Sequence, residues 1–168
     1  MYKRHVYLEG ALISNGNQIG SHGRPLMRDN LRSNPYTGAN YVPVKDPYKY
    51  AGAFVNIASK YGHKGAGILT KFDSIPDSSA VFGITGENAI VDWVFVEVRS
   101  GSDSSQIILT RAGLLQRDGD IVDLDGISPL RTPGIGAGQY YIVVRHRNHL
   151  GVMSKKIHNS NLIDLTSI

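Results

Sequence analysis

The chain has 168 residues, of which 41% are hydrophobic and 19% charged, a composition that excludes a disordered chain and predicts one folded domain. The absence of cysteine excludes disulfides, thiolate metal sites and cysteine nucleophiles. The net charge of +4 arises within residues 1–50, where the basic side chains are scattered, which argues against a nucleic-acid partner. No apolar run approaches the ~20 residues of a membrane-spanning helix, so we expect no membrane span.

The first part of the sequence predicts loops more than regular structure. His5–Glu9 alternates in polarity and is predicted as a first strand. Residues 11–50 are rich in Asn, Gly, Pro and Ser without a sustained period, which predicts long loops with one helical turn at Met27–Leu31, within a loop-rich part that spans 11–66. Two short strands, at residues 53–58 and 67–72, and a turn at Pro76–Ser79 complete this part.

From residue 88 onward the pattern is that of consecutive strands joined by short turns. In residues 90–99 three valines alternate with Trp93 and Phe95, which gives the strand an aliphatic face and a partly aromatic one. Asp118–Gly119 is predicted as a tight two-residue hairpin turn with positive φ at both positions. Further strands are predicted at residues 106–110, 139–147 and 161–165.

This order of elements, with no long amphipathic helix, predicts an all-β fold: an antiparallel β-sandwich with long N-terminal loops. We expect residues 1–168 to form a single domain with its core strands in 88–168. The N-terminal loops should wrap one side and cover Trp93 and Phe95. The core is expected around residues 90–99, 106–125 and 139–147.

Four carboxylates in "RDGDIVDLDG" raise the question of a calcium site, because calcium binds several hard oxygen ligands. Strand alternation places Asp123 and Asp125 on one face, and these two are the calcium candidates. Asp118 is better explained by the turn, and Asp120 by pairing with Arg117 across it. The twelve-residue helix-loop-helix calcium pattern is absent, so hairpin chemistry is the favoured interpretation, and we predict no other cofactor.

The stretch "YYIVVRHRNHLGVM" begins as an apolar strand and continues with five polar residues. Alternation places Arg145, Arg147 and His149 on one face and His146 and Asn148 on the other. The two histidines then point to opposite sides, a poor arrangement for joint metal ligation. No nucleophile-elbow sequence accompanies the many Ser and Asp residues, and "GIGAG" precedes a strand instead of following one. We therefore interpret the stretch as scaffold and expect no enzymatic activity.

Four stretches, "NAIVDWVFVEVR", "LLQRDGDIVDLDGISPL", "AGQYYIVVRHRNHLGVM" and "LR…YVPVKDPY", resemble a domain of large secreted proteins of Bacteroidetes-type bacteria. Those proteins are described as hemagglutinin-like or cell-surface proteins and are associated with type IX secretion. The resemblance implies an extracellular or cell-surface location and carries over no catalytic residue. It also implies a structural signature, formed by Asp92, Trp93, Asp118, Gly119, Asp120, Arg145, His146, Arg147, Asn148 and His149.

The function we expect is that of a non-catalytic structural or adhesive module that contacts copies of itself or neighbouring modules of its parent chain. Both chain ends are predicted as strands, and strands without a partner add to a neighbouring sheet and build a filament. The alternative is a carbohydrate-binding accessory module of a polymer-degrading enzyme, because exposed aromatic rings stack on glycans. Its motivation is a concentration of tyrosines, although packing between the loops and the sheets is the favoured role of these rings: Tyr2, Tyr7, Tyr36, Tyr41, Tyr48 and Tyr50.

Overall fold

The computed structural model describes residues 6–8, 11–12, 18–21, 23–49, 63–64 and 73–159. The strands predicted at 53–58, 67–72 and 161–165 lie outside these residues. Within them, no helix has the length and apolar character needed to cross a membrane.

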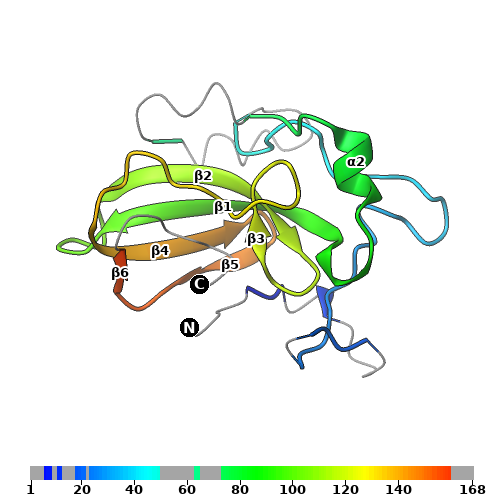
Figure 1. Cartoon of the computed structure of the whole chain (residues 1–168), viewed down its shortest axis with the longest axis horizontal. Helices are drawn as coiled ribbons and strands as arrows, with labels where there is room; N and C mark the ends of the chain where they lie inside the picture. The colour runs from blue at the N-terminus through cyan, green and yellow to red at the C-terminus, as the bar shows by residue number, and fades with distance from the viewer. Residues whose placement is uncertain are drawn as a thin grey trace.

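The described strands form one antiparallel sheet, which confirms the all-β prediction. They are β1 (Ile90–Ser100), β2 (Ile107–Gln116), β3 (Ile121–Val122), β4 (Gly138–His146), β5 (His149–Met153) and β6 (Ile157–Asn159). Their order is β3-β2-β1-β4-β5, with β6 also paired to β4 (Figure 1). The second sheet that a sandwich requires is not found among the described residues, so the sandwich stays a prediction.

Strand β1 is the centre of the core, and its first nine residues are buried. Its aliphatic face packs with apolar residues of the other strands and with Leu8 and Met27 from the N-terminal part of the chain. Leu8 also donates its backbone N–H to the Met27 sulfur at 3.2 Å. The sheet therefore needs segments outside the strands to bury this face.

The aromatic face of β1 is covered by a different part of the chain. The indole Nε1 of Trp93 donates to the carbonyl of Pro43 at 2.7 Å, and the Tyr48 hydroxyl donates to the carbonyl of Trp93 at 3.2 Å. The rings of Tyr48 and Phe95 lie 5.2 Å apart. The expected cover over Trp93 and Phe95 is thus present in the described residues 42–48.

A short helix, α2 (Ser78–Gly83), also packs on the aromatic face through Val81 and stands at the end of the sheet where β1 begins (Figure 1). The sequence pattern predicts only a turn at Pro76–Ser79. The helix forms because Asp77 caps its first turn, accepting from the Ala80 amide at 3.0 Å. Six residues are too few for a helical hydrophobic period to be visible. A single 3₁₀ turn, Gly86–Asn88, then leads into β1.

The hairpin between β2 and β3 turns at the predicted place but with a different geometry. Gly119 has φ of +98°, whereas no described residue other than glycine has a positive φ, so Asp118 does not. The Gly119 amide donates to the Gln116 carbonyl at 3.0 Å, and the Gln116 amide donates to the Asp120 carbonyl at 2.8 Å. The connection is therefore a β-turn followed by one glycine at positive φ, which is the three-residue class of hairpin loop.

Two N-terminal predictions are corrected. Residues 6–8, the described part of the first predicted strand, are not in a strand, and the Val6 amide donates to the turn carbonyl of Gly119 at 3.0 Å. The helical turn predicted at Met27–Leu31 lies two residues later, where the Ser33 amide donates to the Asp29 carbonyl at 3.0 Å.

Candidate functional site

A buried carboxylate, Asp92 of β1, organises the polar residues at the end of β4. It is 1% exposed and accepts from two nitrogens of the Arg147 guanidinium, at 2.7 Å and 2.6 Å. It also accepts from Nε2 of His146 at 3.0 Å and from the Trp93 amide at 2.8 Å. A bidentate guanidinium pair of this kind is the strong form of a charge-assisted hydrogen bond. It joins the β4–β5 turn to β1.

His146 and His149 meet, which corrects the prediction that they point to opposite sides. The chain turns at Arg147–Asn148, so His149 begins β5 as the cross-strand partner of His146. Directly opposed residues of an antiparallel pair project to the same face, whereas the prediction assumed one continuous strand. The two Nδ1 atoms lie 2.9 Å apart, and the rings are 4.9 Å apart.

The hydrogen-bond network assigns the tautomers of this pair. Because Nε2 of His146 faces the Asp92 carboxylate, it carries the proton, and Nδ1 of His146 is an acceptor. That atom receives the His149 Nδ1–H and, at 3.2 Å, the backbone N–H of Asn148. Burial lowers the pKa of the His149 imidazole and the neighbouring His146 lowers it further, against an opposing effect of Asp92.

A second buried carboxylate, Glu97, holds the other arginine of the stretch. Its side chain accepts from Arg145 of β4 at 2.6 Å and from Arg99 at 2.7 Å and 2.5 Å. Arg145 and Arg147 therefore bind different carboxylates of β1 on either side of Phe95, and both contacts tie β4 to its neighbour. These are the contacts that a scaffold would make.

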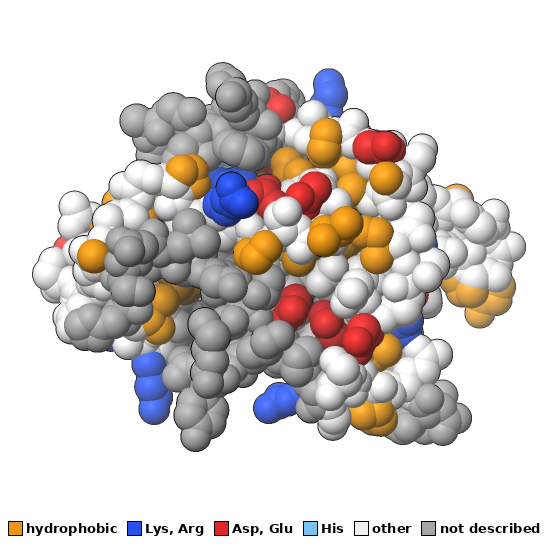
Figure 2. Space-filling model, viewed as in Figure 1, with side chains coloured by type: hydrophobic (Ala, Val, Ile, Leu, Met, Phe, Trp, Pro, Cys, Tyr) orange, Lys and Arg blue, Asp and Glu red, His pale blue; other side chains and the backbone are white. Residues whose placement is uncertain are grey.

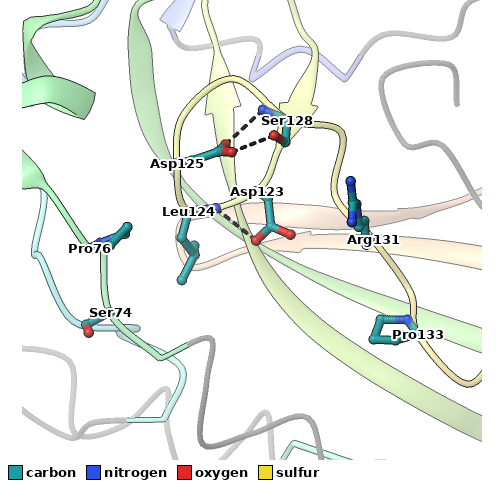
Figure 3. A pocket seen from close by; sticks show the side chains of 8 residues that line it. All are labelled: Ser74, Pro76, Asp123, Leu124, Asp125, Ser128, Arg131 and Pro133. Carbon is teal, nitrogen blue, oxygen red and sulfur yellow. Dashed lines mark hydrogen bonds between the residues drawn. The ribbon is translucent and has the colours of Figure 1, made fainter.

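The calcium candidates line one pocket of about 510 Å³ in the loop after β3 (Figure 3). Asp125 points towards Ser128, accepting from its hydroxyl at 2.5 Å and its amide at 2.8 Å. Asp123 turns the other way, accepting from the Leu124 amide at 2.9 Å and from Arg111 at 2.8 Å. The rest of the lining is Ser74, Pro76, Leu124, Arg131 and Pro133.

Both carboxylates of this pocket already hold internal donors, so a calcium ion would compete with Arg111 for Asp123. Burial raises the pKa of Asp125, but the hydrogen bonds from Ser128 and the Ile127 amide outweigh it and lower the pKa overall. No three His, Asp or Glu side chains gather as metal ligands in the part of the chain that the structure describes. Calcium binding stays a prediction, which a rise in melting temperature on calcium addition would support.

Acidic, basic and hydrophobic side chains lie next to one another on the face shown in Figure 2.

The turn carboxylates play the local role expected of them, with one difference. Asp118 accepts from the Asp120 amide at 3.1 Å, as a turn residue does. Arg117 donates to the carbonyls of Met27 at 2.7 Å and Gly86 at 3.1 Å instead of pairing with Asp120. Its guanidinium therefore ties the hairpin to segments that lie far away in the sequence.

A third polar group, Asp46, His63 and Thr110, was not predicted from the sequence. Nε2 of His63 lies 2.8 Å from the Asp46 carboxylate, and Nδ1 lies 3.1 Å from the Thr110 hydroxyl. The order acid, imidazole, hydroxyl is that of a hydrolytic triad. Thr110, however, is 1% exposed, and its hydroxyl accepts from the Lys64 amide at 2.8 Å. These hydrogen bonds instead hold residues 63–64 against β2. The spacing of these residues gives no sequence signal.

Comparison with known proteins gives no further guide to identity. No family model matches the chain, and no curated protein and no solved structure is significantly similar to it. The resemblance to domains of secreted Bacteroidetes-type proteins stays a prediction.

Proposed function

We propose that the chain is a non-catalytic extracellular structural or adhesive module of a secreted bacterial surface protein, acting by contact with other protein surfaces, including copies of itself. The observation that supports this most is the edge of the sheet formed by β5. β5 is the last strand of the sheet order in the described residues, and most of its side chains are exposed.

The two edges of the sheet differ in a way that favours contact through β5. At the other edge, β3 has only two residues, with Val122 bridged to Pro129, and the Thr110 amide of β2 already donates to the Lys64 carbonyl at 3.0 Å. Along β5, Leu150 is 95% exposed, and Val152 and Met153 are more than half exposed. A strand with apolar side chains at a sheet edge is a template for β-strand addition.

The non-catalytic part of the proposal is supported by the partners of the polar groups. Asp92, Glu97 and Thr110 are all at most 3% exposed and are engaged by side chains or amides of the same chain. Buried groups with internal partners hold a fold together and do not meet a substrate. If β5 pairs with a different surface of the next copy, the contact repeats head to tail and builds a filament.

The test is self-association of the full chain, measured by light scattering over a range of concentrations and by electron microscopy. We expect concentration-dependent assembly that Val152→Lys abolishes, because a lysine on an edge strand opposes pairing with another strand. Ile127→Lys is the matched control, since Ile127 is 75% exposed in the loop after β3 and lies outside β5. A monodisperse monomer at high concentration, with β5 amides protected from hydrogen exchange, would contradict self-assembly.

A carbohydrate-binding module is the second candidate, because two of the N-terminal tyrosines are open to solvent. Tyr36 is 94% exposed and Tyr41 54% exposed, whereas Tyr48 is buried. Tyr2 and Tyr50 lie outside the described residues. A glycan array would support this candidate if binding were lost in Tyr36→Ala but kept in Tyr36→Phe, which retains the ring that stacks on a sugar.

A further inference from the structure

The pair His146 and His149 has one imidazole fixed in place by a buried carboxylate. Nε2 of His146 donates to Asp92, whose side chain is itself held by Arg147. Metal-binding histidines commonly donate their second ring N–H to a carboxylate in this way, which fixes the tautomer and makes the other nitrogen a better ligand. Nδ1 of His146 therefore presents its lone pair towards His149.

Nδ1 of His149 lies at a distance from Nδ1 of His146 that suits a metal ion bound by both. Two ligands about 2.0–2.1 Å from one metal ion and at right angles to each other are about 2.9 Å apart. The Nδ1 atoms of His146 and His149 are separated by 2.9 Å. Without an ion, the same distance is bridged by the His149 Nδ1–H, so a metal ion would take the place of that proton.

We propose that His146 and His149 bind one first-row divalent metal ion of the Cu²⁺, Ni²⁺ or Zn²⁺ class through their Nδ1 atoms. Imidazole is a preferred ligand of these ions, and a right-angled pair of nitrogens suits the tetragonal geometry of Cu²⁺ and Ni²⁺ best. On binding, the proton on Nδ1 of His149 moves through solvent to Nε2 of the same ring, so that His149 stays neutral and its Nδ1 lone pair is free for the metal ion. The Asn148 amide gives up its contact with His146 at this exposed turn.

The remaining coordination positions belong to water or to a ligand from another molecule. His146 is buried and Asn148 exposed, whereas His149 is partly exposed at the start of β5. The ion would thus be fixed by the protein on one side and open on the other. None of the residues that line the pocket of Asp123 and Asp125 takes part in this site.

The experiment follows every imidazole of the full chain separately. The chain has six histidines, and two-bond ¹H–¹⁵N spectra distinguish Nδ1 from Nε2 in each of them. We expect Zn²⁺ to shift Nδ1 of His146 and His149 in a saturable 1:1 titration, and Cu²⁺ to give an electron paramagnetic resonance spectrum with two coordinated nitrogens. His149→Gln should weaken Cu²⁺ binding at least about tenfold, because one of two ligands is lost.

His158→Gln is the control for binding by a histidine outside this pair, and it should leave the Cu²⁺ affinity unchanged. Equal affinity of the parent chain and His149→Gln would overturn the proposal. So would spectra in which His149 keeps its Nδ1 proton while the metal saturates other histidines. These spectra are recorded on the parent chain, so the result is decisive even if His149→Gln fails to fold.

Discussion

Asp92 is a negative charge in a buried position, and Arg147 is the side chain that balances it. Removing one partner of a buried pair leaves the other charge without compensation, which costs about 3–5 kcal/mol. We expect Arg147→Met to lower the free energy of unfolding by this amount, measured by urea denaturation.

Arg145→Met is the control for this prediction, because Arg145 is 31% exposed and Glu97 keeps Arg99 as a partner. Its cost should be about 1 kcal/mol or less, because Arg145 is partly exposed and Arg99 still compensates the charge of Glu97. Equal losses of unfolding free energy in the two variants would show that the burial of the Asp92–Arg147 pair does not determine how much it stabilises the fold.

Asp125 gives a pH dependence whose sign follows from its lowered pKa. A carboxyl with a lower pKa in the folded state stabilises the protein above its unfolded pKa of about 3.9, and this contribution is lost as the pH falls through the folded value. We expect Asp125→Asn to lose stability less steeply than the parent chain below about pH 4, because it has no carboxyl to protonate there. Denaturation curves recorded between about pH 2 and pH 6 would check this, and parallel pH profiles would contradict it.

At the same scale, the sequence was a better guide to which polar residues are structurally important than to the direction in which their side chains point. Alternation placed the valines and Trp93 of β1 correctly because the strand is regular there. It failed at His149 because the turn at Arg147–Asn148 interrupts the strand, and two polar residues give no sign of where a strand ends. Asp46 and His63 could not be found, since only the folded chain brings them to Thr110.

At the scale of elements, the hairpin between β2 and β3 depends on the backbone conformation of Gly119. Its φ of +98° is one that side chains other than glycine rarely adopt. We expect Gly119→Ala to destabilise the fold by about 1–2 kcal/mol. Gly136→Ala is the control, because Gly136 has no positive φ and a Cβ there would meet open space. Thermal unfolding of both variants would check this, and an equal shift of their melting temperatures would contradict it.

Element boundaries were predicted less well than element types. The strand predicted at 106–110 continues to Gln116 as β2, through Arg111 and Gly113, which both look unfavourable for a buried strand. Arg111 is accommodated because Asp123 and the Arg131 carbonyl accept from it. Gly113 fits because a Cβ there would lie 3.0 Å from Leu130, so the position has no room for a larger residue.

At the scale of the whole molecule, both faces of β1 are buried although the described strands form a single sheet. The aliphatic face is closed by Leu8 and Met27, and the aromatic face by residues 42–48 and α2. The sequence contained part of this information, since both faces of the strand begin apolar. It could not show which segments cover them, because loop residues that bury apolar side chains have no period.

Met27 is therefore expected to hold the N-terminal segment on the sheet. It is 0% exposed, its sulfur accepts from the Leu8 amide, and its carbonyl accepts from Arg117. Met27→Ala removes the packed side chain and the sulfur acceptor together, and it should cost about 2–5 kcal/mol in unfolding free energy. If the segment is released, trypsin should also cleave faster after Arg28.

Leu31→Ala separates this effect from a general loss of apolar surface in the same segment. Leu31 is 38% exposed, so its truncation should change stability by no more than about 0.5 kcal/mol and leave the rate of cleavage unchanged. Chemical denaturation and timed trypsin digestion of the two variants are the measurements. If Met27→Ala were as stable and as resistant to trypsin as Leu31→Ala, the N-terminal segment would be an appendage of the sheet and not a part of its core.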